Sequence, residues 1–176
     1  MPHFQFRLPV REELTALQKI AIDDENPILL TGVPGSGKTV VAIYRVVRSS
    51  NTSKLFTYTR MLTVAIKNST NILQRDSSSK VCSVYEWFLK KCNTKLGNII
   101  NDENEISNCL KLKNIFFDEL IFDESQDLPT SIYNSFVKFS NKISLGADDA
   151  QLVFDNGCTE NELSKIFKNN ISHELD

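Results

Sequence analysis

The hydrophobic positions of the chain fall into two kinds of run that alternate along the sequence. Short apolar runs typical of buried strands lie at Ile28–Thr31, Lys54–Thr59, near Val81, Glu119–Glu124 and Lys142–Asp148. Amphipathic runs of helix length lie between them. Such alternation is typical of a parallel sheet covered by helices on both faces. We therefore predict an α/β fold, organised as a single domain over residues 1–176.

The spacing of polar and apolar residues also predicts the helices. The first spans Arg11–Ile22, with Leu14, Leu17, Ile20 and Ala21 on its buried side. Later helices are expected from Lys38 to about Ser49, from near Arg60, from Ser83, after Pro129 and from Thr159. Ser83 and Thr159 each precede a glutamate by three residues, which is the spacing of a capping box. The polar stretch Asn93–Asn108 is interpreted as a loop or a small insertion.

Composition narrows the class of protein. A length of 176 residues suits one α/β domain, and a net charge of −2 gives no general attraction to nucleic acid. No apolar run approaches the roughly 20 residues that cross a bilayer. The N-terminus lacks the apolar core of a secretory signal. We therefore expect a cytoplasmic protein without a membrane partner.

The cysteines and histidines are few and scattered. Four cysteines occur without a CxxC pair, and there are only two histidines. This pattern argues against both a zinc site and a disulfide framework. We expect reduced and mostly packed thiols.

A glycine-rich loop follows the first strand. Its residues match G-x-x-x-x-G-K-[ST] without a mismatch: Gly32, Val33, Pro34, Gly35, Ser36, Gly37, Lys38 and Thr39. In such a loop the backbone N–H groups surround a β-phosphate, and the following helix adds the positive end of its dipole. Lys38 can reach the β and γ oxygens, and the Thr39 hydroxyl can coordinate Mg²⁺. The motif predicts a site for ATP and Mg²⁺.

An acidic pair stands at the end of a later strand, in "LIFDESQD". Asp123 emerges at the carboxyl edge of that strand, where open α/β sheets bind ligands, and is predicted to hold Mg²⁺ as the partner of Thr39. Glu124 is predicted to act as general base on the water that attacks the γ-phosphate. The earlier pair Asp118-Glu119 precedes the strand, so we assign it to the surface.

These residues resemble the motifs of superfamily 1 helicases of the UvrD/Rep type. "DESQD" is similar to the DExQD box of that family, and Gln18 lies where the family has the glutamine that reads adenine. "FTYTRML" resembles motif Ia, "VCSVYEWF" lies at the place of motif Ib, and "LGADDAQLVF" resembles the GDxxQ motif III. The five motifs occur in the family order. The resemblance implies a P-loop NTPase fold of the RecA-like kind, and coupling of ATP hydrolysis to movement along single-stranded DNA.

The resemblance also implies roles for individual residues. DNA contacts would fall on Thr57, Tyr58, Thr59 and Arg60 of motif Ia. Gln151 of motif III would sense the γ-phosphate, and either Asp148 or Asp149 would be the acid of that motif. For Tyr58, packing and stacking on a base remain equal alternatives. Trp87 and Phe88 are interpreted as core because they lie at core spacing on a helix.

The sequence departs from the family in two respects. The motifs of a second RecA-like domain, which supplies arginines to the transferring phosphoryl group, do not occur in these 176 residues. Only a minimal insertion, around residues 90–114, could replace the helical insertion of many relatives. We therefore expect an N-terminal ATPase half that is monomeric, binds nucleotide, hydrolyses it slowly and needs a second RecA-like domain in the full-length chain to unwind DNA.

Three alternatives remain open from the sequence. One is a P-loop ATPase that never handles nucleic acid, such as a kinase or a switch protein. Another is a non-catalytic module that binds nucleotide and docks onto a partner. The third is a helicase domain that acts on RNA, since motif Ia would contact mainly the backbone of the nucleic acid.

Overall fold

The computed structural model describes residues 7–148, 150 and 157–176. These residues form a six-stranded sheet in the order β3-β2-β4-β5-β1-β6, in which every neighbouring pair of strands is parallel. The strands are β1 (Ile28–Gly32), β2 (Lys54–Thr57), β3 (Val81–Ser83), β4 (Phe117–Phe122), β5 (Ser140–Gly146) and β6 (Ile171–Leu175). The predicted parallel α/β architecture is confirmed.

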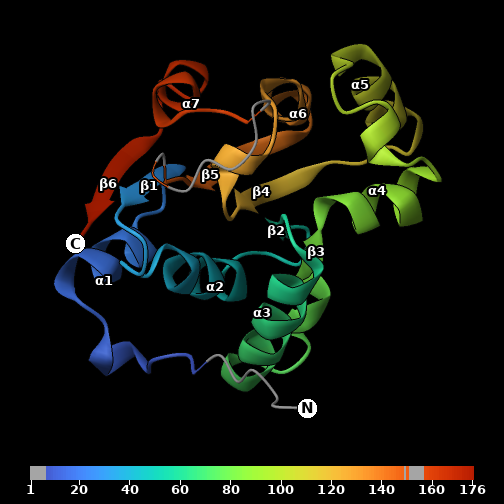
Figure 1. The fold of residues 1–176 in the computed structure, drawn as a ribbon. Helices are drawn as coiled ribbons and strands as arrows, with labels where there is room; N and C mark the ends of the chain where they lie inside the picture. The colour runs from blue at the N-terminus through green and yellow to red at the C-terminus, as the bar shows by residue number, and fades with distance from the viewer. Residues whose placement is uncertain (1–6, 149, 151–156) are drawn as a thin grey trace.

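Helices cover both faces of the sheet (Figure 1). One face carries α1 (Ala16–Asp23), α2 (Lys38–Arg48) and α3 (Arg60–Leu73). The other carries α4 (Val84–Cys92), α5 (Glu103–Leu112), α6 (Thr130–Phe136) and α7 (Glu160–Ile166). No helix within the described ranges is long and apolar enough to cross a membrane.

An aromatic cluster fills the core on the α4 and α6 side of the sheet. The Phe56 ring of β2 lies 5.5 Å from Trp87 and 5.4 Å from Phe122 between ring centroids. Phe136 of α6 lies 5.7 Å from the same ring. Trp87 and Phe88 are 6% and 0% exposed, so their predicted place in the core is confirmed. Tilted and edge-on aromatic pairs of this kind add stability beyond the area that they bury.

The first predicted helix differs from the structure. Arg11–Glu13 form a 3₁₀ turn, and α1 begins at Ala16, where the Thr15 hydroxyl accepts a hydrogen bond from the Gln18 N–H. Leu14 and Ala21 are buried as predicted, but Leu17 and Ile20 are 40% and 56% exposed. The prediction from apolar spacing assumes one continuous helix. The break at Leu14 and Thr15 changes the helical phase, so the later residues Leu17 and Ile20 face away from the core.

Two elements were missed or misjudged. The stretch Asn93–Asn108 is not simply a loop, because α5 begins at Glu103 with the Asp102 carboxylate accepting from two backbone N–H groups. Ile106 and Leu110, one helical turn apart, are buried. Strand β6 was not predicted, because most of its side chains are exposed or half-buried and do not form an apolar run. It pairs with the whole length of β1, from Ile28 to Gly32.

Glu119 is buried, which corrects its assignment to the surface. Its side chain is 10% exposed, and its carboxylate accepts from Arg45 at 2.8 Å and from the Ser144 hydroxyl at 2.8 Å. Arg45 also donates to the backbone carbonyls of Ala21 and Asp24. Asp118 remains partly exposed, so the surface assignment holds for that residue alone. Strand alternation puts the two neighbours on opposite sides.

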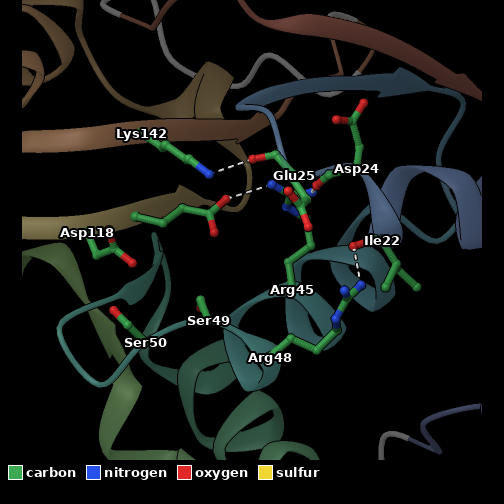
Figure 2. A pocket seen from close by; sticks show the side chains of 10 residues that line it. Ile22, Asp24, Glu25, Arg45, Arg48, Ser49, Ser50, Asp118 and Lys142 are labelled. Carbon is green, nitrogen blue, oxygen red and sulfur yellow. Dashed lines mark hydrogen bonds and ion pairs between the residues drawn. The ribbon is translucent and has the colours of Figure 1, made fainter.

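The Arg45–Glu119 pair and the hydrogen bonds around it join four segments that are distant in the sequence. Figure 2 shows Arg45 and Lys142 directed at the connection between α1 and β1, beside a pocket of about 300 Å³. Lys142 donates to the Glu25 carbonyl at 2.6 Å, and Arg45 donates to the Asn26 carbonyl at 3.0 Å. The interactions fasten α2, β4 and β5 to the segment that leads into β1.

We predict that Arg45→Met lowers the free energy of unfolding by about 3–5 kcal/mol, because it leaves the buried Glu119 carboxylate without its partner. Arg48→Met is the matched control, since Arg48 pairs with Asp23 at the surface and such pairs contribute about 0–1 kcal/mol. Urea denaturation of the two variants measures the difference. Equal losses of stability would contradict the structural role given to Arg45.

Candidate nucleotide site

The glycine-rich loop connects the end of β1 to the start of α2, as the sequence predicted. Gly37 caps α2 in the left-handed conformation, with φ of 92°, and a Cβ there would lie 2.4 Å from the Gln18 amide nitrogen. Gly32 has φ of 135°, and a Cβ there would lie 2.2 Å from the Leu175 carbonyl oxygen of β6. Both positions therefore require glycine. The loop is fixed between α1 on one side and β6 on the other.

Lys38 lies under this loop with its ammonium group fully engaged. The Nζ atom donates to the carbonyls of Gly32 at 2.6 Å and Val33 at 3.1 Å, and to the Asp148 carboxylate at 3.2 Å. The Lys38 and Asp148 side chains are 8% and 4% exposed. Because an ammonium group has three protons, a phosphate oxygen that binds Lys38 must replace one of these acceptors.

The Thr39 hydroxyl contacts the carboxylate of Asp123, which is its predicted partner in holding Mg²⁺. Its oxygen lies 3.1 and 3.0 Å from the two carboxylate oxygens. The strand order separates the two elements: Asp123 follows β4, which is not the neighbour of β1, because β5 lies between them. The carboxyl ends of all three strands meet at one edge, which brings the two side chains together across β5.

Asp123 is buried beside a second carboxylate, that of Glu124. Burial, followed by the neighbouring Glu124 carboxylate, raises the pKa of Asp123 to about 7, although Thr39 and Lys38 act in the opposite direction. Burial and Glu124 also raise the pKa of Asp127, to about 6. Two carboxylates and a hydroxyl at the edge of a phosphate loop are hard oxygen ligands of the kind that Mg²⁺ prefers. A divalent cation would favour the charged form of these carboxylates, which burial and the repulsion from Glu124 disfavour.

The loop also contains a buried polar atom without a partner among the described residues. This atom is the Ser36 hydroxyl oxygen, on a residue that is 5% exposed. Buried hydroxyl groups normally form at least one hydrogen bond. The free hydroxyl, the left-handed glycines and the N-terminus of an eleven-residue helix fit the phosphate groups of a nucleotide.

Glu124 is held in an uncommon conformation beside Asp123. Its φ is 56°, in the left-handed region that costs a non-glycine residue of order 1 kcal/mol or more. The Gln126 amide donates to the Glu124 carboxylate at 2.7 Å. Gln126 was not among the predicted site residues. Its only sequence signal was its place in "DESQD", since its contacts depend on the fold.

Gln18 contacts the phosphate loop directly. Its amide nitrogen donates to the Ser36 carbonyl at 2.9 Å, and its amide oxygen accepts from the Thr15 N–H at 3.0 Å. The structure thus places Gln18 beside the loop, where it braces Ser36. Its reading of adenine stays a prediction.

The motif Ia residues lie at the end of β2 and the start of α3. Thr57 is buried, and its hydroxyl oxygen lies 2.5 Å from the hydroxyl oxygen of Thr63. The Thr59 hydroxyl caps α3 by accepting from the Leu62 N–H. Tyr58 is half-buried with its ring 5.8 Å from that of Tyr85, and Arg60 is exposed. Of the four residues, Tyr58 and Arg60 have side chains that are both accessible and not used to cap the helix.

Motif III is only partly within the described residues. Gln151 and Asp149 lie outside them, so their predicted roles stay predictions. Asp148 is described, and its carboxylate binds Lys38. The Asp148 N–H donates to the Gln126 amide oxygen at 3.2 Å. Asp148 is therefore the acid of this motif that the described structure joins to the phosphate loop.

Comparisons with known proteins gave similarity in structure only. No family model and no curated protein sequence matches the chain. Among solved structures, the helicase domain of Hef from Pyrococcus furiosus matches with a TM-score of 0.49 and 14% identity, over 89% of this chain and 37% of that one. A structure of Pif1 helicases, from work on unwinding of forked double-stranded DNA, matches with a TM-score of 0.46 and 19% identity, over 92% and 43%. The chain thus spans less than half the length of either structure.

We predict that Asp148→Ala strengthens nucleotide binding by about tenfold, because it frees one proton of Lys38 and removes a negative charge from the phosphate site. Asp118→Ala is the matched control, because it removes the same charge near the amino end of β4, at the end of the strands opposite the phosphate loop. Titration with a fluorescent ADP analogue measures both affinities. Unchanged or weaker binding by Asp148→Ala would contradict a competition between Asp148 and phosphate for Lys38.

Proposed function

We propose that the chain is the ATP-binding and ATP-hydrolysing domain of a superfamily 1 helicase of the UvrD/Rep type, acting on single-stranded DNA. The observation that carries the proposal is the contact of Thr39 with Asp123 beside Glu124. It joins the phosphate loop to the acidic box at the edge of the sheet. The order of the helicase-like motifs along the sequence supports the same conclusion.

Each residue of the site has a role in this proposal. Lys38 and the loop N–H groups would bind the β- and γ-phosphates of ATP, and Thr39 and Asp123 would hold Mg²⁺. The metal would supply charge neutralisation at the phosphate oxygens. Glu124 would take a proton from water as the water oxygen bonds to the γ-phosphorus, while the bond from that phosphorus to the bridging oxygen breaks and ADP leaves.

A hollow beside motif Ia supports the proposed contact with nucleic acid. It has a volume of about 600 Å³, and its lining includes Arg60, Tyr85, Leu89, Lys95 and Lys90, the last paired with Glu86. Basic side chains around aromatic and aliphatic ones suit a single strand, whose phosphates bind cations and whose bases stack on rings. This hollow lies at the same edge of the sheet as the carboxyl ends of β2 and β3.

A second RecA-like domain in the full-length chain completes the proposed enzyme. Loss of an arginine supplied in trans costs roughly 10³–10⁵ in rate in P-loop NTPases. The 176 residues alone are therefore expected to bind Mg·ATP and to hydrolyse it slowly. We propose a monomer in the cytoplasm for this chain, with strand separation left to the full-length protein.

We predict slow ATP turnover by the chain that rises when a single-stranded DNA oligonucleotide is added. Glu124→Gln should lower turnover by about 10²–10⁴-fold, because the amide cannot accept the proton of water. Glu105→Gln, on the exposed side of α5, is the matched control. Turnover is measured by release of phosphate. ATP binding without any effect of DNA or of Glu124→Gln would favour the non-catalytic module instead.

We predict that Arg60→Ala and Tyr58→Ala each weaken binding of single-stranded DNA. Loss of one stacked ring costs about 1–3 kcal/mol of binding free energy per base. Loss of one phosphate contact lowers by about 0.7 the magnitude of the slope of log K against the logarithm of the salt concentration. Lys168→Ala, which removes an exposed positive charge elsewhere, is the control. Fluorescence anisotropy at several salt concentrations measures the effects. Equal weakening by the control would indicate nonspecific attraction, and tighter binding of RNA would favour the RNA-directed alternative.

A further inference from the structure

Gln126 links the two halves of the nucleotide site. It is 1% exposed and belongs to the 3₁₀ turn Ser125–Asp127 that follows Glu124. Its amide nitrogen donates to the Glu124 carboxylate at 2.7 Å, and its amide oxygen accepts from the Asp148 N–H at 3.2 Å. The same residue therefore contacts the proposed general base and the segment that holds Lys38.

The backbone around Gln126 is fastened on both sides. The Cys158 N–H donates to the Gln126 carbonyl at 3.0 Å, and the Tyr133 hydroxyl of α6 donates to the Ser125 carbonyl at 2.5 Å. Both Tyr133 and Cys158 are fully buried. The backbone at Gln126 is thus fixed on both sides. The Gln126 side-chain amide can therefore orient a neighbouring side chain to which it donates.

Glu124 is such a neighbour. Its half-buried carboxylate receives a hydrogen bond from Gln126 at only one oxygen, Oε2. The other carboxylate oxygen, Oε1, accepts no hydrogen bond from the described residues. It can therefore accept one from a water molecule. The left-handed φ of Glu124 adds a backbone constraint at the same residue. A base held at one oxygen and open at the other is suited to accept a proton in a defined direction.

We infer that Gln126 is a positioning residue, which orients the Glu124 carboxylate and couples that orientation to the Lys38–Asp148 contact. This inference rests on the proposed function and specifies how its base is controlled. The connection runs from Lys38 through Asp148 and Gln126 to Glu124. A phosphate that binds the Lys38 ammonium group in place of Asp148 frees the Asp148 side chain. Asp148 is the residue whose backbone N–H donates to Gln126.

The test is Gln126→Met, which keeps the length of the side chain and removes both hydrogen bonds. We expect kcat to fall by about tenfold to a hundredfold, as for other losses of catalytic alignment. Affinity for a fluorescent ATP analogue should not fall, because Gln126 contacts no predicted phosphate ligand directly and its loss removes a contact that holds Asp148 beside Lys38. Gln74→Met, at the exposed end of α3, is the matched control and should match the wild type.

A second variant separates positioning from damage to the fold. In the Glu124→Gln background, Gln126→Met should cause no further loss of turnover, because its effect passes through the Glu124 carboxylate. A further loss of equal size in that background would overturn the inference. So would unchanged kcat in Gln126→Met, or a fall in affinity and melting temperature that accounts for the fall in kcat.

A crystal structure of Gln126→Met decides the matter even where turnover is too slow to measure. The inference expects the Glu124 carboxylate to leave its wild-type position while Asp123 and Thr39 keep theirs. An unmoved Glu124 would overturn it. Failure of the wild type to bind nucleotide would instead refute the proposed function, and the crystal structures would still decide the role of Gln126.

Discussion

The contact between Thr39 and Asp123 is the interaction on which the site depends. It spans 84 residues of sequence and brings the first turn of α2 against the end of β4, across the intervening β5. Only parallel strands that end at one edge allow this approach. The burial of Asp123 that results, together with the neighbouring Glu124 carboxylate, raises the pKa of its carboxyl group to about 7.

The rest of the structure holds this edge in place from the opposite side. Arg45 and Glu119 fasten α2 and β4 to the segment before β1, near the amino ends of the strands. The aromatic cluster around Phe56 fixes β2 and β4 beneath α4 and α6. The ion pair joins α2 and β4, and the aromatic cluster also includes β4; the opposite end of α2 carries Lys38, and Asp123 follows β4.

The local parts of the site were predictable and the long-range parts were not. The phosphate loop is eight consecutive residues, and Asp123 stands at the end of a clear apolar strand, so both could be placed from the sequence. The bond from Lys38 to Asp148 joins residues 110 apart, and Gln126 acts through contacts with Glu124 and Asp148. No periodicity reports such contacts. Strand β6 was missed for a related reason, since an edge strand with exposed side chains has no apolar pattern.

A crystal structure of the chain with Mg²⁺ and a non-hydrolysable ATP analogue tests the central claim most directly. We expect Mg²⁺ to bind the Thr39 hydroxyl, with Asp123 beside it, and the Lys38 ammonium group to leave Asp148 for the phosphates. The glycine-rich loop would surround the β-phosphate. A nucleotide bound elsewhere, or an intact contact between Thr39 and Asp123 with no metal between them, would contradict the account.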